Sequence, residues 1–330
     1  MGGEMTIRRA AVAAFAILGG AFALAQVAAA DDKWPSKPVR ILVGFGAGGG
    51  TDIVARVVAE RLSETLGQQF VVENKPGAGG TLAGGLAARA DADGYTALAI
   101  STGHSVSAVT VKQLPYDPVA SFAPVGILAS SAYVVAVPKG SPATDLKSLV
   151  EHVKNEAGKL NYATVSVGST QHLIAEDVRQ RTGMDAKHLA VRTTGDVITA
   201  LLRGDAAFGV ELYHAVRGQV EAGELKLIAV STPQRWPAAP GIPTLAESGL
   251  AGFGYSGWYG LMFPASVPQT IIDKLHKTLQ QELSRDDVKK RLEGAGALAG
   301  LSAPGDLSKL IASEIVSFRA VAAKAGIEPK

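Results

Sequence analysis

The stretch ILVGFGAGGGTD, Ile41–Asp52, predicts a buried strand that ends in a glycine-rich turn and runs directly into a helix. Such a turn points free backbone N–H groups and the positive end of a helix dipole at one place, which favours an anion there. A second strand-to-helix turn of the same kind, VGSTQH at Val167–His172, lies in the other half of the chain. The two turns together predict two lobes that close on a carboxylate.

The N-terminal segment has the pattern of a signal peptide. Arg8 and Arg9 precede the apolar run Ala10–Ala25, and the small residues Ala28–Ala30 form a cleavage site before Asp31. The apolar run is shorter than the roughly 20 residues that span a bilayer, so a cleaved signal is favoured over a retained membrane anchor. We therefore expect residues 1–30 to be removed and the mature chain to be exported.

Composition limits the possible partners. The chain has no cysteine, so it has neither a lipid-attachment site nor a disulfide. Without the predicted signal peptide, 30 basic residues stand against 29 acidic ones. No basic stripe marks a nucleic-acid surface, and no further stretch is long and apolar enough to span a membrane. The sequence thus predicts a soluble globular monomer that does not bind nucleic acid.

Predicted strands and helices alternate from Val39 onward, which indicates an α/β fold with largely parallel sheets. The β-rich segment Phe122–Val137 is long enough to cross from one lobe into another, and the strand predicted at Leu225–Ser231 is suited to the return. We expect the first lobe to hold residues 31–128 and 236–330 and the second to hold 129–235. Two lobes joined by two crossovers are typical of a binding protein that closes about a hinge.

A set of motifs along the whole mature chain resembles the Bug-type (TctC-like) solute receptors of tripartite tricarboxylate transporters. The motifs, in chain order, are WPSKPVR at Trp34–Arg40, GGGTD at Gly48–Asp52, VVENKPGAGG at Val71–Gly80, DGYT at Asp93–Thr96, LPYDP at Leu114–Pro118, LNYA at Leu160–Ala163, GSTQHL at Gly168–Leu173, PTLAESG at Pro243–Gly249 and SGWYGL at Ser256–Leu261. The resemblance implies a periplasmic receptor with a Venus-flytrap fold. It also implies two partners, a small carboxylate ligand and the membrane subunits of the transporter.

In that family the two turns grip one carboxylate of the ligand, partly through bound water. Carried over to this chain, the resemblance implies ligand contacts from two groups of residues: Phe45, Gly48, Gly49 and Thr51 in the first turn, and Ser169, Thr170 and Gln171 in the second. A different reading exists for the hydroxyl residues, because Thr51, Ser169 and Thr170 stand where a side chain can cap a helix. Phe45 could equally anchor its turn in the core.

Three departures from the family pattern fall near the expected cleft. The first turn reads Gly44-Phe45-Gly46-Ala47 where members often have prolines. Arg192 stands in a second-lobe segment that also differs, and its guanidinium could hold a second carboxylate or lie in solvent. Glu211 replaces a frequent aspartate, and it could accept hydrogen bonds from a ligand or cap the next helix. The preferred acid therefore cannot be copied from a relative.

Two further candidates, Thr102 and His104, follow a predicted strand at an end where cleft residues are expected. For His104, a loop histidine satisfied by its neighbours is the alternative to a ligand contact. No cofactor is expected, and no metal site is predicted, because His172 and Glu176 alone are too few ligands for zinc.

Three other kinds of protein are alternatives to a transport receptor. Gly44, Gly46 and Gly49 match a dinucleotide-binding fingerprint, but a chain with 38 glycines produces that pattern easily. An exported enzyme on the same scaffold is disfavoured because the chain has no G-x-S-x-G elbow, no H-E-x-x-H motif and no thiol nucleophile. A sensory receptor that signals to a membrane kinase has the same sequence pattern as a transport receptor, so this alternative stays open.

Overall fold

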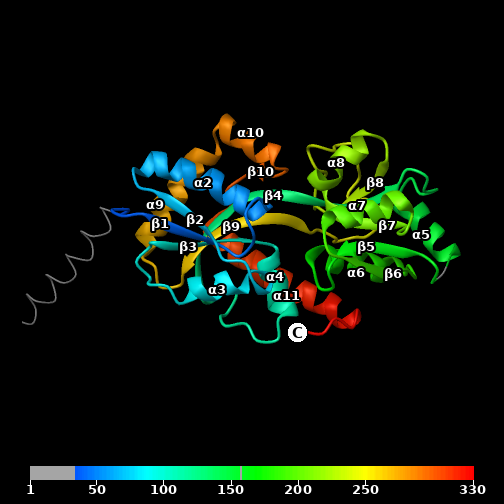
Figure 1. The fold of residues 1–330 in the computed structure, drawn as a ribbon, viewed down its shortest axis with the longest axis horizontal. Helices are drawn as coiled ribbons and strands as arrows, with labels where there is room; N and C mark the ends of the chain where they lie inside the picture. The colour runs from blue at the N-terminus through cyan, green and yellow to red at the C-terminus, as the bar shows by residue number, and fades with distance from the viewer. Residues whose placement is uncertain (1–33, 157) are drawn as a thin grey trace, which may run out of the picture.

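The computed structural model describes residues 34–156 and 158–330. The predicted signal peptide lies outside the described residues. Two α/β lobes lie side by side along the longest axis of the molecule (Figure 1). No helix in the described part of the chain is both long and apolar enough to cross a membrane.

The first lobe is built around three parallel strands, with β1 between β2 and β3. Its N-terminal elements are β1 (Val39–Val43), α2 (Gly50–Leu66), β2 (Phe70–Asn74), the 3-10 turn η1 (Ala78–Gly80), α3 (Thr81–Ala88), β3 (Thr96–Ser101) and α4 (Gly103–Thr110). Its C-terminal elements are α9 (Gln269–Leu283), α10 (Asp286–Gly294), the short β10 (Leu298–Ala299) and α11 (Pro304–Lys324). The predicted helix after the glycine-rich turn is confirmed, and Gly67 ends it in the left-handed conformation.

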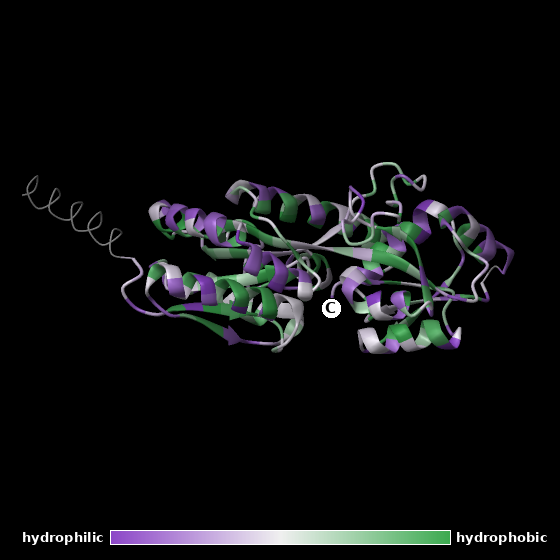
Figure 2. Cartoon of the chain, turned by 90° about the horizontal axis from the view of Figure 1, so that it is seen from above, coloured by the Kyte–Doolittle hydropathy of each residue, from purple (hydrophilic) through white to green (hydrophobic). Residues whose placement is uncertain are grey.

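The second lobe repeats this pattern around β5, which pairs in parallel with β6 and β7. Its elements are α5 (Leu146–Asn155), β5 (Asn161–Val165), α6 (Thr170–Thr182), β6 (Lys187–Val191), α7 (Thr194–Arg203), β7 (Phe208–Leu212), α8 (Tyr213–Glu221) and β8 (Leu225–Val230). Apolar residues concentrate on the strands and polar residues on the outer helix faces (Figure 2). This segregation places a hydrophobic core on each side of the sheet in both lobes.

Two antiparallel strands join the lobes. The 17-residue strand β4 (Phe122–Pro138) pairs with β9 (Ser256–Pro264) over Phe122–Ala132. Its second half, Tyr133–Pro138, pairs with β7 and β8 in the second lobe. The expected outward crossover is therefore confirmed, but the return is made by β9. The expectation that Leu225–Ser231 returns the chain is wrong, because β8 pairs only within the second lobe.

The boundary expected at residue 236 moves for the same reason. Trp236 packs into the second-lobe core beside Val216 and Val230, and Phe253 packs into the core that contains Tyr162 and Phe208. The Pro/Gly-rich segment 236–255 is thus part of the second lobe, and its apolar anchors hold it there before β9 begins.

Helix α11 lies beneath the junction of the two lobes (Figure 1). Leu307 and Ile311 pack into a first-lobe core, whereas Phe318 and Val321 pack into the core shared with the second lobe. The helix therefore contacts both lobes along its length and backs the two crossover strands.

Candidate functional site

A cleft of about 420 Å³ lies between the two lobes. It is lined by a set of first-lobe, second-lobe and crossover residues: Phe45, Gly49, Gly50, Thr51, Ser101, Thr102, Ser131, Tyr133, Gln171, Thr194, Leu212, Gly257, Trp258 and Tyr259. Among these described lining residues, none is Lys, Arg or His. The lining therefore offers a negative ligand only backbone N–H groups and neutral polar side chains.

Five helix N-termini supply these N–H groups. Helices α2, α4, α6, α7 and α8 follow strands β1, β3, β5, β6 and β7, and each contributes a first-turn or N-cap residue to the cleft. The first N–H groups of a helix have no partner within the helix, and the helix dipole places partial positive charge at the same end. The carboxyl edge of an α/β sheet is where ligands bind for this reason. The arrangement suits an anion of modest size.

On the first lobe, a buried carboxylate holds the glycine-rich turn. Asp52 is 2% exposed, and its Oδ2 accepts the Gly48 N–H at 2.9 Å. Its Oδ1 accepts the Asn74 Nδ2–H at 2.8 Å, and Asn74 also donates to the Phe45 carbonyl at 3.0 Å. Burial raises the pKa of Asp52, but hydrogen bonds from Arg56, Gly48 and Asn74 outweigh it and leave the pKa below its ordinary value. Asp52 is thus an ionised brace for the turn.

On the second lobe, Ser169 serves its own helix. Its Oγ accepts the His172 N–H at 3.1 Å and donates to the Val165 carbonyl, so the hydroxyl caps α6. The capping alternative is observed, and Ser169 is not among the residues that line the cleft. In the first lobe the N-cap residue of α2 is Gly49, so no side chain caps this helix. Thr51 is not used as a cap and lines the cleft.

The second-lobe wall of the cleft is made by Gln171 and Thr194, and Glu211 lies behind both. Glu211 is 1% exposed. Gln171 Nε2 donates to its Oε2 at 3.4 Å, and the Thr194 hydroxyl reaches both carboxylate oxygens at 3.3 Å. Glu211 is therefore placed to orient two cleft side chains rather than to touch the cleft itself.

The floor of the cleft comes from the crossover strands. Tyr133 and Ser131 lie on β4, and Trp258 and Tyr259 lie on β9. The Tyr259 hydroxyl is so close to Gly50 that a Cβ there would lie 2.3 Å from its oxygen. The first turn of α2 therefore requires glycine at this point. Burial raises the pKa of both tyrosines, which keeps their hydroxyls neutral.

Tyr133 also links the two lobes. The Thr170 and Thr102 side chains, one from each lobe, lie near its hydroxyl and partly offset the rise that burial causes in the pKa of Tyr133. Thr102 further accepts the Trp258 backbone N–H at 3.2 Å. The two threonines thus meet at the hinge, although only Thr102 lines the cleft.

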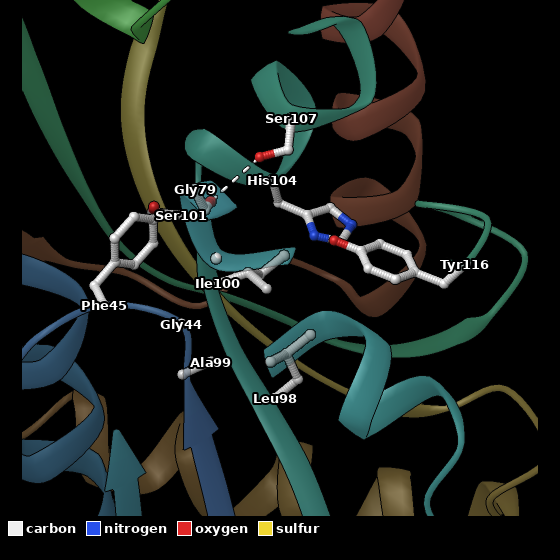
Figure 3. Close-up of a pocket in the computed structure, with 11 residues that line it drawn as sticks. Gly44, Phe45, Gly79, Leu98, Ala99, Ile100, Ser101, His104, Ser107 and Tyr116 are labelled. Atoms are coloured by element: carbon white, nitrogen blue, oxygen red, sulfur yellow. Dashed lines mark hydrogen bonds between the residues drawn. The ribbon is translucent and has the colours of Figure 1, made fainter. Parts of the chain in front are cut away.

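His104 lies behind the cleft and not in it. Its Nε2 is 2.8 Å from the Pro118 carbonyl oxygen, and its ring stacks on Tyr116 (Figure 3). Burial lowers the pKa of His104. It lines a cavity of about 20 Å³, room for about one water molecule. Phe45 and Ser101 line both this cavity and the cleft, and Figure 3 shows both residues at the cavity.

The predicted residues thus separate into three groups. Phe45, Gly49, Thr51, Thr102 and Gln171 line the cleft. Gly48, Ser169, Thr170 and Glu211 do not line it: Gly48 is exposed in the first turn, where Asp52 accepts its N–H, and the other three support the second-lobe wall and the floor. His104 and Arg192 lie elsewhere, because His104 faces the small cavity and Arg192 is an exposed residue beyond the end of β6. Neither residue lines the cleft, so a ligand contact from either stays a prediction.

Sequence reasoning missed the floor residues and Thr194. Tyr133 and Ser131 fall within a long apolar strand that gives no local sign of a ligand site. Thr194 had a signal, because Thr193-Thr194-Gly195-Asp196 forms a capping box that starts a helix after a strand. The same rule that singled out the first two turns also applies there.

Known proteins share the sequence pattern and the fold of this chain. Residues 54–327 match the family model described as "Tripartite tricarboxylate transporter family receptor". The solved structure of the periplasmic binding protein BugD is 32% identical, covers 90% of this chain and 100% of its own, and superposes with a TM-score of 0.73. Rpa4515 of R. palustris, solved with adipate, is 32% identical with a TM-score of 0.77, covering 90% of this chain and 100% of its own.

MatC of Rhodopseudomonas palustris, solved with bound malate, is 30% identical with a TM-score of 0.72, and the match covers 87% of this chain and 99% of MatC. The chain therefore belongs to the tripartite tricarboxylate transporter receptor family and has the α/β periplasmic-binding-protein fold. In the described residues, no group of three or more His, Cys, Asp or Glu side chains is arranged to hold a metal ion.

Proposed function

We propose that this protein captures a small organic carboxylate in the interlobe cleft and delivers it to a membrane transporter of the tripartite tricarboxylate type. The observation that carries the proposal is the convergence of five helix N-termini on a cleft whose described lining residues include no cation. Neutral donors of this kind favour a carboxylate without demanding a fixed number of charges.

Closure of the lobes follows from where the donors lie. The α2 and α4 termini belong to the first lobe, and the α6, α7 and α8 termini belong to the second. A ligand that contacts both sets gains more in the closed state than in the open one, so it shifts the population toward closure. The crossover strands β4 and β9 are the natural hinge.

The carboxylate-bound relatives support the ligand class. Adipate is a flexible six-carbon diacid and malate is a shorter hydroxy diacid, and both occupy proteins about one-third identical to this chain. The proposal extends to a binding role without catalysis, and to a monomer that is processed after Ala30 and resides in the periplasm. Mass spectrometry of the mature N-terminus tests the processing.

A thermal-shift screen of the mature protein tests the function. Adipate, malate, benzoate and a tricarboxylate such as citrate are compared with their uncharged amides. An acid at 100 times its dissociation constant should add about 2.7 kcal/mol to the free energy of unfolding. The matching amides should give no shift. If none of the acids stabilises the protein, or if acid and amide act equally, the proposal is refuted. Turnover of an acid during incubation would indicate an enzyme instead.

A further inference from the structure

The buried carboxyl of Glu211 differs from the other acids that brace the site. Asp52, on the opposite wall, is held by the Arg56 guanidinium and by donors at 2.8–3.0 Å. The partners of Glu211 are the neutral donors Gln171, Thr194 and the Leu212 N–H, all at 3.3–3.4 Å. Such distances are at the long end for hydrogen bonds, so a negative charge on Glu211 would be poorly compensated.

The charged and titratable residues around the end of β7 do not compensate a negative charge on Glu211. They are Tyr133 on β4, His172 on α6, Asp196 on α7, Tyr213, His214 and Arg217 on α8, and Arg192 after β6. None of them contributes to the pKa of Glu211. Burial raises that pKa to about 7, and the hydrogen bonds from Gln171, Leu212 and Thr194 lower it only in part. The neutral and ionised forms therefore coexist near neutral pH.

The two forms present different groups to the cleft. An ionised Glu211 accepts the Gln171 amide N–H and the Thr194 hydroxyl proton, so both donors turn away from a ligand. A neutral Glu211 has one O–H to donate, for example to the Gln171 Oε1 after the amide flips. The amide NH₂ and the Thr194 hydroxyl then become available to a ligand oxygen. A nearby ligand carboxylate also repels an ionised Glu211 directly.

We propose that Glu211 is a proton-coupled positioning residue: it takes up a proton from solvent when a carboxylate binds, and this turns the donors of Gln171 and Thr194 toward the ligand. This inference rests on the proposed function, because it assumes a carboxylate in the cleft. It adds that the affinity for carboxylates depends on pH through one residue of the second-lobe wall.

The expected pH dependence has a definite sign. A group with a pKa near 7 is about 90% neutral at pH 6 and about 3% neutral at pH 8.5. If the neutral form is the binding-competent one, the apparent dissociation constant rises as the neutral fraction falls. The affinity should therefore be about thirtyfold weaker at pH 8.5 than at pH 6. Near pH 8, binding should take up close to one proton per ligand.

Titration calorimetry in two buffers of different ionisation enthalpy measures this proton uptake. The probe is whichever of adipate, malate and benzoate binds most tightly, titrated into the mature protein at pH 6, 7, 8 and 8.5. Glu211→Gln should remove the proton uptake and give an affinity that changes by less than about twofold across this range. Thermal unfolding of the variant checks that it is folded.

Glu314→Gln is the matched control. Glu314 is also buried, its pKa is raised to about 7 by burial, and it accepts the Trp258 Nε1–H at 3.0 Å beneath the floor. The inference predicts that this variant keeps the proton uptake on binding. Uptake that disappears in Glu314→Gln but persists in Glu211→Gln would overturn the assignment.

The titration of the wild-type protein tests the inference even if Glu211→Gln does not fold. Carboxylate binding with no proton uptake and no pH dependence refutes the inference while the proposed function stands. No binding of any acid at any pH refutes both.

Discussion

The two walls of the cleft rest on two buried acids that differ in charge. Asp52 supports the first-lobe turn as an ionised brace, because Arg56 and two short hydrogen bonds compensate its charge. Glu211 supports the second-lobe wall with neutral partners alone, and its pKa is raised to about 7. Both side chains are shielded from solvent, but Glu211 lies deeper in the protein, so stronger burial and weaker compensation by its partners together raise its pKa. The first wall has a permanent frame, whereas the second can change its hydrogen-bond pattern.

Loss of the Asp52 carboxylate, which braces the first-lobe turn, should have the largest effect on stability and on binding. Asp52→Ala leaves the Gly48 N–H and the Asn74 amide without their partner and removes the anchor of Arg56. Arg56 is half exposed and can rehydrate, so we expect the free energy of unfolding to fall by about 2–3 kcal/mol. Binding of every acid should weaken as well. Urea denaturation and calorimetry measure the two effects.

Asp196→Ala is the control for this prediction. Asp196 is a first-turn acid of a second-lobe helix, but it is exposed and belongs to a capping box. Its loss should cost about 1 kcal/mol. A cost for Asp52→Ala no larger than this would mean that the turn needs no buried brace.

The next largest effect should come from disturbing the contact between Gly50 in the first wall and Tyr259 in the floor. Gly50→Ala places a methyl group 2.3 Å from the buried Tyr259 hydroxyl oxygen, so Tyr259 or the first turn of α2 must move. We expect every acid to bind at least about tenfold more weakly, about 1.4 kcal/mol. At Gly49 a Cβ meets only the Gly46 carbonyl oxygen at 3.5 Å, so Gly49→Ala should change affinity by less than about threefold. Equal losses at the two positions would contradict this geometry.

A smaller effect is expected at the second turn. Ser169→Ala removes the α6 cap, which typically costs about 1 kcal/mol of stability. Because the hydroxyl bonds His172 and Val165 and lines no part of the cleft, calorimetry should give affinities within about twofold of wild type once the protein is folded. A selective loss of acid binding without loss of stability would return Ser169 to the binding site.

The smallest effect should be that of Arg192→Ala. This side chain is exposed and lies outside the cleft lining, so an ion pair with a ligand would be screened by water. The affinities for a diacid and its monoacid analogue should both change by under about 0.5 kcal/mol. A selective penalty for the diacid would show that Arg192 reaches the ligand when the lobes close.

The sequence alone determined the local secondary structure of this protein. A strand, a glycine- or hydroxyl-rich turn and a helix with one apolar face are all set by neighbours along the chain, so the first-lobe turn, α6 and the α/β fold could be predicted. The family resemblance pointed to Phe45, Thr51 and Gln171, and all three line the cleft at the carboxyl edge of the parallel strands.

The tertiary structure decided what depends on partners distant in sequence. Leu225–Val230 and Ser256–Pro264 both look like strands, and only pairing with β4 shows that the second one crosses between the lobes. His104 is drawn away from the cleft by Tyr116 and the Pro118 carbonyl, which no spacing rule predicts. Asp52, in the first turn of α2, has its cation Arg56 one turn along the same helix, whereas folding places Glu211, near the end of β7, among neutral donors from α6 and α7. Charge compensation is a property of three-dimensional neighbours, so the protonation behaviour of the site appears only in the folded chain.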